Sequence, residues 1–231
     1  KKLQTTLQYV NLFKPRFFMP FAGRYTLTGK NVDLNKYRGE PELEHAYEYL
    51  VRKIPKNESK CIVLNHECDF DISTGKQSQE FVPVDFEDKS NFVNSVFSKR
   101  KYEYEDEAIP SEKDLIKLLP NCYENFEKVR KSINWISDTK IILKISEDSY
   151  AVITCDGTGY KTCSSAEIKN INQFLIMTMD TRLLYWILQG PRKAHWSIAD
   201  IGCHIIYKRV PNNYERGLYY CWNNFYSNNY S

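Results

Sequence analysis

Residues 140–179 alternate short apolar, β-branched runs with turn residues, and this pattern constrains the fold more than any other feature of the sequence. Such runs, bounded by Glu, Asp, Ser and Gly, are typical of strands joined by tight hairpins. Asp156-Gly157 has the composition of a hairpin turn that leads into the strand at 160–163. Strands are therefore predicted at 140–145, 150–155, 160–163 and 174–179.

Helical segments precede and follow these strands. Residues 111–135 are amphipathic, begin with Ser111 and Asp114 in a capping arrangement, and are expected to be interrupted at Pro120. Beyond the fourth strand, Asp180 is the expected N-cap of a helix at Thr181–Gln189.

That helix should stop at Gly190-Pro191, because Gly ends helices readily and Pro cannot continue them. A fifth strand is predicted at 204–210 and a closing helix at 214–226. Residues 111–231 are thus expected to form an α+β domain with a mostly antiparallel sheet covered by helices.

The first part of the chain has shorter and less regular elements. Residues 76–110 are charged and weakly patterned, so they are interpreted as a linker with one short helix near 90–99. The expected domains are therefore 1–75 and 111–231. Helices are predicted at Lys2–Phe13 and 42–54, and strands at 17–21, 61–64 and 70–72.

Charge, cysteine content and hydropathy restrict the class of protein. A net charge of +3 without clustered basic residues gives little reason to expect nucleic acid as a partner. The seven cysteines are odd in number and none has CxxC spacing, so reduced thiols in a cytoplasmic protein are expected. No run of 18 apolar residues is present, so no membrane span is expected. The chain begins with Lys1-Lys2 rather than Met, which favours a part of a longer protein.

Candidate catalytic groups are sparse. The four histidines, His45, His66, His195 and His204, are scattered, whereas a dinuclear site of the metallo-β-lactamase type needs a clustered HxHxDH run. No nucleophile elbow, P-loop or dinucleotide fingerprint is present. We therefore expect no metal ligand set in this chain.

The segment after Gly190 is the strongest candidate for ligand contact. Arg192 and His195 could face a phosphate or carboxylate together, from a loop held by a rigid scaffold. The alternative is a loop that caps the next element and packs through Trp196. Both interpretations remain open at the level of sequence.

Two stretches resemble a known family. Residues 15–25 read Pro-Arg-Phe-Phe-Met-Pro-Phe-Ala-Gly-Arg-Tyr, and residues 180–225 contain Asp-Thr-Arg-Leu-Leu, Ile-Leu-Gln-Gly, Ala-Asp-Ile-Gly and Arg-Val-Pro-Asn-Asn-Tyr-Glu-Arg-Gly-Leu-Tyr-Tyr in order. They resemble the C-terminal portion of a metallo-β-lactamase-fold metallohydrolase of the CMP-N-acetylneuraminate hydroxylase-like branch. Residues 76–135 match poorly. The later part is also similar to a sterol-carrier-type α+β domain.

The resemblance implies a remnant of an αββα sandwich at 1–75 and an accessory domain at 111–231. It implies a parent enzyme that uses zinc or iron and acts on nucleotide sugars or surface-polysaccharide precursors. The metal ligands would lie upstream, and the position of a late histidine in the superfamily reads Phe21-Ala22-Gly23 here, so no catalytic residue is transferred. Arg24 and Tyr25 join Arg192, His195 and Trp196 as candidate substrate contacts.

Two functions remain open. The chain is either the non-catalytic C-terminal part of such an enzyme, whose partners are the missing N-terminal half and a small-molecule substrate, or a stand-alone module that binds an apolar or sugar-nucleotide ligand. In the second case Trp186, Trp196 and Tyr207 would form the wall of the site. Either function is compatible with a homo-oligomer and with a cytoplasmic location.

Overall fold

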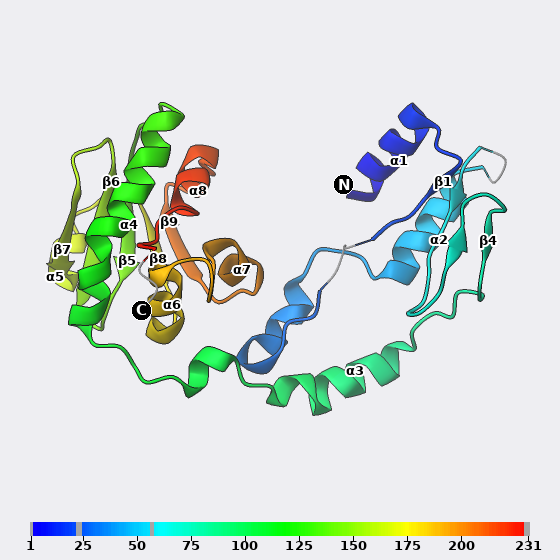
Figure 1. Ribbon diagram of the computed structural model, residues 1–231, viewed down its shortest axis with the longest axis horizontal. Helices are drawn as coiled ribbons and strands as arrows, with labels where there is room; N and C mark the ends of the chain where they lie inside the picture. The colour runs from blue at the N-terminus through cyan, green and yellow to red at the C-terminus, as the bar shows by residue number, and fades with distance from the viewer. Residues whose placement is uncertain (1, 22–24, 56–57, 229–231) are drawn as a thin grey trace. The chain divides into compact units, whose positions relative to one another are not determined.

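The computed structural model describes residues 2–21, 25–55 and 58–228, and it divides the chain into two compact units, Lys1–Arg100 and Lys101–Ser231 (Figure 1). The division at Arg100 lies inside the segment 76–110 in which the sequence places a linker.

The unit Lys1–Arg100 is built from short elements. Among its described residues there are two sheets of two strands each, and each strand is only two residues long. β1 pairs with β2 in parallel, whereas β3 pairs with β4 antiparallel. The described elements are α1 (Lys2–Phe13), β1 (Phe17–Phe18), η1 (Gly29–Tyr37), α2 (Leu43–Lys53), β2 (Lys60–Cys61), β3 (Phe70–Asp71), β4 (Lys76–Gln77), α3 (Phe86–Ser95) and η2 (Phe97–Lys99).

The helices of this unit agree with the sequence better than the strands do. α1 has the predicted bounds, and α2 loses only its two terminal residues, which serve as caps. The strand predicted at 17–21 is shorter because Pro20 has no N–H to donate to a ladder. A small buried cluster of Val10, Leu50, Ile54 and Cys61 joins α1, α2 and β2.

The predicted linker is largely folded. The helix expected near 90–99 begins earlier, at Phe86, because the Asp85 carboxylate accepts the backbone N–H groups of Glu87 and Asp88 at 2.8 and 2.9 Å. η2 continues it, and the 3-10 helix η3 (Glu103–Asp106) follows in the second unit.

The unit Lys101–Ser231 contains one five-stranded sheet of order β7-β6-β5-β8-β9. β5, β6 and β7 form an antiparallel meander, β8 then lies parallel to β5, and β9 is antiparallel to β8. The mostly antiparallel sheet expected from the sequence is therefore corrected to a mixed sheet, because the connection after β7 returns the chain so that β8 runs parallel to β5. Its elements are α4 (Glu112–Ser132), β5 (Ser137–Lys144), β6 (Ser149–Cys155), β7 (Tyr160–Ser164), α5 (Ser165–Ile168), β8 (Phe174–Thr178), α6 (Thr181–Gln189), α7 (Trp196–Ile201), β9 (Ile206–Val210) and α8 (Arg216–Trp222).

Helix α4 begins as predicted but does not break. Ser111 and Asp114 form the expected capping box. The predicted interruption at Pro120 is wrong, because α4 continues through it as one helix. Leu119 and Cys122, on either side of the proline, are fully buried, and this burial offsets the backbone hydrogen bond that a proline removes.

The C-terminal helices show one agreement and two differences. α6 has the predicted bounds, and the Asp180 carboxylate accepts the Arg182 N–H at 3.0 Å. The segment expected to be a loop contains α7, and the closing helix predicted at 214–226 is confined to α8. β9 likewise begins at Ile206 rather than at residue 204.

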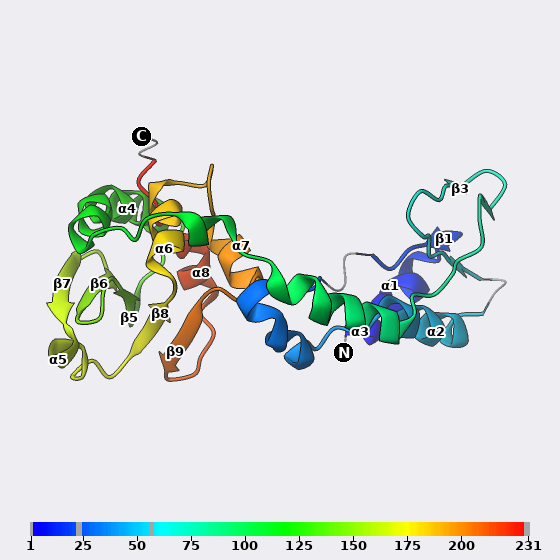
Figure 2. The same cartoon turned by 90° about the horizontal axis from the view of Figure 1, so that it is seen from below.

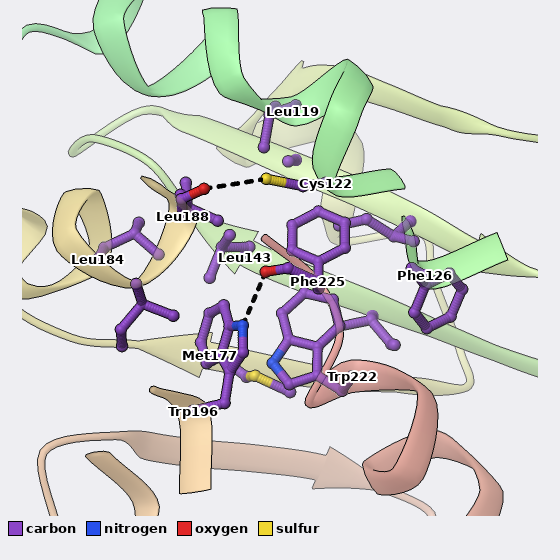
Figure 3. Close-up of a cluster of buried hydrophobic side chains, with 14 of the residues drawn as sticks. Leu119, Cys122, Phe126, Leu143, Met177, Leu184, Leu188, Trp196, Trp222 and Phe225 are labelled. Carbon is purple, nitrogen blue, oxygen red and sulfur yellow. Dashed lines mark hydrogen bonds between the residues drawn. The ribbon is translucent and has the colours of Figure 1, made fainter. Parts of the chain in front are cut away.

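Helices cover one face of the sheet. Figure 2 shows α4, α6 and α8 on one side of the strands and α5 on the other. The covered face forms the main core with large aromatic rings, several of which are drawn in Figure 3. Phe126, Trp196, Trp222 and Phe225 meet there, with the Trp222 and Phe225 rings stacked at 4.4 Å.

The α+β class expected from the sequence is confirmed by this mixture of helices and strands. Among the helices of the described residues, none has the length and apolar character needed to cross a bilayer.

Candidate functional site

The predicted contact residues after α6 have different surroundings from one another. Arg192 is exposed, as expected for a ligand contact. His195 is the N-cap of α7: its Nδ1 accepts the backbone N–H of Ser197 at 3.2 Å and lies 2.8 Å from the Ser197 hydroxyl. The structure thus gives His195 the capping role that was the alternative interpretation of this segment.

Trp196 belongs to the core. Its side chain is 2% exposed, and its indole N–H donates to the Phe225 carbonyl at 2.8 Å (Figure 3). The ring lies 4.8 Å from that of Trp222. A residue packed in this way holds the C-terminal segment against the sheet and does not present its ring to solvent.

The three residues proposed as the wall of the site, Trp186, Trp196 and Tyr207, have different surroundings. Trp186 lies edge-on to Tyr104 at 6.4 Å. Tyr207 is half-buried, and burial together with nearby Asp200 raises the pKa of its hydroxyl well above the ordinary value. Neither hollow described below is lined by any of the three wall residues.

The candidate substrate contacts in the unit Lys1–Arg100 are Arg24 and Tyr25, which are adjacent in the sequence. Tyr25 is partly exposed, and the Arg38 guanidinium lies 4.0 Å from the centre of its ring. Arg24 lies outside the described residues. Tyr25 belongs to the unit Lys1–Arg100, and the segment after α6 belongs to the unit Lys101–Ser231.

One row of side chains crosses the face of the five-stranded sheet that is opposite to α4, α6 and α8. We call this face the open face. Ile142 of β5 has Val152 and Ile176 as its neighbours on β6 and β8. Val152 in turn pairs with Lys161 of β7, and Ile176 pairs with Lys208 of β9. One row across the sheet therefore has three apolar side chains in its middle and a lysine at each end.

Two further lysines complete this pattern. Lys140 and Lys144 lie two residues before and after Ile142, so they share its face of the sheet. We call Lys140, Lys144, Lys161 and Lys208 the lysine frame. It surrounds an apolar floor that includes Ile142, which is fully buried.

A hollow of about 470 Å³ opens beside this floor. Val152 forms part of its base, and Lys140, Lys161, Glu167 and Ile171 form its sides. Its volume falls in the range of small-molecule sites, and so does its mixture of an apolar base with few charged groups.

The β6–β7 hairpin fixes the rim of the hollow. Thr158 donates its backbone N–H and its hydroxyl to the Asp156 carboxylate at 3.0 and 2.6 Å, and these bonds hold the pKa of Asp156 well below its usual value. The Thr154 hydroxyl donates to the Gly159 carbonyl at 2.7 Å. Gly157 and Gly159 both have positive φ, at 90° and 118°, which is why the turn requires glycine.

The lysines of the frame differ in their partners. Lys140 lies 3.4 Å from Asp156, and Lys161 lies 3.9 Å from Glu167. Within the described part of the chain, no carboxylate pairs with Lys144 or Lys208. Two lysines of the frame thus have no carboxylate partner among the described residues, which favours an anionic ligand.

A second hollow, of about 620 Å³, lies within the first unit. It is lined by Pro20 and Phe21, which follow β1, and by Val63 and Leu64, which follow β2. Parallel strands place their carboxyl ends at one edge, where ligands commonly bind in α/β folds.

Four of the five charged side chains that line this second hollow are paired with one another, and the fifth, Glu44, accepts the Val84 N–H at 3.3 Å. Glu40 bonds to Lys2, and Glu42 bonds to Lys89 at 2.6 Å. The interior that remains is mainly apolar, so it offers less charge for a specific anion than the open face of the sheet.

Sequence reasoning did not find the lysine frame. The signal was present as lysines at alternate strand positions, Lys140 and Lys144 on β5 and Lys161 on β7. It was not recognised because the four lysines come from three strands, and only the strand order brings them together.

Comparisons of the chain with protein-family models, with curated proteins and with solved structures found no match.

Proposed function

We propose that this chain is the non-catalytic C-terminal part of a cytoplasmic, metal-dependent hydrolase or hydroxylase-like enzyme of the metallo-β-lactamase superfamily that acts on nucleotide sugars or polysaccharide precursors. Lys1–Arg100 completes an αββα sandwich with strands from outside this sequence, and Lys101–Ser231 is the accessory domain. Zinc or iron, and its ligands, belong to the remainder of the enzyme.

The observation that carries this proposal is the small size of the sheets in Lys1–Arg100. The parallel pair β1–β2 is joined by the Lys60 N–H to Arg16 carbonyl and Ile62 N–H to Phe18 carbonyl bonds, at 3.0 and 2.9 Å. Parallel strands occur almost only in larger sheets covered on both faces. A pair this short therefore calls for additional strands beside it.

Exposed apolar side chains in the same unit support the proposal. Leu12 and Phe13 at the end of α1 are each 72% exposed, and Phe21 after β1 is 81% exposed. Contiguous exposed apolar residues are typical of a surface that another element covers.

The described residues do not fit a metal centre of their own. No three His, Cys, Asp or Glu side chains come together among them. His66 and Glu67 approach to 3.8 Å, but both are almost fully exposed. No step through a metal is therefore assigned to this chain.

Hydrogen exchange of the monomeric chain tests the proposal. The amides of Lys60 and Ile62 should exchange at least about 100-fold faster than those of Ile141 and Leu143 in β5, because an incomplete sheet opens locally. Proteolysis should likewise cleave 1–75 before 135–231. Adding the sandwich part from the parent reading frame in trans should slow exchange at Lys60 and Ile62. Equal protection of the two sheets in the monomer would refute the proposal.

The hollow on the open face of the sheet favours a second function. Here the unit Lys101–Ser231 is a binding module for an apolar or sugar-nucleotide ligand, and the ligand lies on the open face rather than against Trp196. Thermal shift assays with a nucleotide sugar and with a fluorescent fatty acid test it. No stabilisation by either ligand would reject this function.

A further inference from the structure

We propose that the hollow bordered by Lys140 and Lys161 binds the phosphate groups of a soluble nucleoside-diphosphate-type ligand. The inference rests on the second function above and names the ligand class and its contacts.

The sheet register brings the two lysines to one place. Lys161 on β7 pairs with Val152 of β6, and Val152 pairs with Ile142 of β5, two residues after Lys140. Two strand spacings and two residues along a strand separate the Lys140 and Lys161 Cα atoms by roughly 12 Å. Lysine side chains of roughly 6 Å can therefore direct both ammonium groups at one diphosphate above Val152.

The ion pairs already present do not block this arrangement. Lys161 and Glu167 are more than half exposed at 3.9 Å, and Lys140 and Asp156 lie 3.4 Å apart. The solvent-exposed Lys161–Glu167 pair is weak, so a diphosphate can replace Glu167 as the partner of Lys161. Lys140 is only 29% exposed, but its ammonium has three N–H donors and can contact a diphosphate while it stays beside Asp156. Lys144 and Lys208 add positive potential on the same face.

The rest of the hollow suits the nucleoside. Val152 and Ile171 provide an apolar surface for a planar base. Glu167 is held in place by the Ser164 N–H at 2.8 Å and hydroxyl at 3.1 Å, both on Oε2. Its Oε1 faces Lys161 and can accept a hydrogen bond from a ribose hydroxyl.

The test is a two-dimensional amide NMR titration of the full chain with uridine diphosphate and, in parallel, with uridine. Uridine diphosphate should shift the amides of Val152, Lys161 and Ile171, and uridine should shift them at least tenfold less at equal concentration. The Lys140→Gln/Lys161→Gln double variant should weaken binding at least tenfold. The matched control Lys128→Gln, on the exposed side of α4, should leave binding unchanged.

Three results would overturn the inference. The first is the absence of shifts with uridine diphosphate, and the second is equal binding of uridine. The third is equal weakening by Lys128→Gln. If the double variant loses its far-ultraviolet dichroism, the more exposed Lys161→Gln alone replaces it.

Two further arms separate this inference from its alternatives. Binding of a fluorescent fatty acid without binding of uridine diphosphate would overturn the phosphate site and leave the binding-module function standing. Sedimentation with phosphatidylglycerol vesicles that depends on Lys140 and Lys161, again without nucleotide binding, would overturn it in favour of a lipid headgroup.

Discussion

Replacing Glu127 by Gln should destabilise the unit Lys101–Ser231 more than any surface change. Glu127 and Arg130 on α4 are each 7% exposed. The Arg130 Nε and Nη2 donate to the two Glu127 carboxylate oxygens at 2.5 and 3.0 Å, and Nη1 donates to the Trp135 carbonyl at 2.8 Å. The carboxylate also raises the pKa of Arg130, so the guanidinium stays charged.

The magnitude follows from the charge that is left behind. Glutamine retains the shape of the side chain but leaves a buried guanidinium without a counterion. Removing one partner of a buried pair costs about 3–5 kcal/mol of unfolding free energy. For a unit of this size, that loss corresponds to a decrease in melting temperature of roughly 10–20 °C.

Urea denaturation followed by tryptophan fluorescence measures this loss selectively, because Trp135, Trp186, Trp196 and Trp222 all lie in Lys101–Ser231. Glu124→Gln, on the exposed side of the same helix, is the control and should stay within about 0.5 kcal/mol.

A second substitution separates the buried charge from other effects. Adding Arg130→Met to Glu127→Gln should recover most of the lost stability, since an apolar replacement of both partners is often neutral. A stability of Glu127→Gln within about 0.5 kcal/mol of the wild type would refute the reasoning.

Three further outcomes are expected. Hydrogen bonds from Ser73 and Thr74 lower the pKa of Asp71 to about 2. The contribution of Asp71 to stability is therefore complete above about pH 4 and is lost as the pH falls towards 2. Ser73→Ala should raise the midpoint of the Asp71 titration measured by carboxyl carbon NMR, and an unchanged midpoint would contradict this. Arg192→Ala should change unfolding free energy by less than about 0.5 kcal/mol and lower the activity of the parent enzyme, whereas Trp196→Ala should cost about 3–5 kcal/mol. Unchanged activity of Arg192→Ala would show that its segment is scaffold. Metal analysis of the purified chain should find no stoichiometric zinc or iron, and one tightly held ion per chain would contradict this.

Local signals predicted those elements whose ends are set by nearby residues. Asp180 and Gly190 lie at the two ends of α6, and both the cap and the stop act within one turn of the helix. The β6–β7 hairpin was predictable for the same reason, because Gly157 provides the positive φ that the turn needs.

Elements that depend on tertiary contacts were predicted less well. Pro120 was expected to break α4, but the burial of its neighbours against the sheet overrides the local preference. α7 is short, and its first residue, Trp196, is held by a bond to Phe225 from far along the chain. Neither contact can be deduced from the residues of the element itself.

The lysine frame can be predicted only when the strand order is known, and for this reason the sequence alone pointed to a different segment. Arg192 and His195 are close in sequence and attracted a functional interpretation, yet the His195 ring caps α7. Lys140, Lys161 and Lys208 lie far apart in sequence and share one face only because β8 returns parallel to β5 and places β9 at the far edge. Because β7 lies beside β6 and β9 lies beside β8, Lys161 and Lys208 are at the two edges of the sheet, and the apolar centre of the sheet lies between them. A site of this kind is a property of register, so measured binding that depends on Lys161 would also be evidence for the topology that brings these residues together.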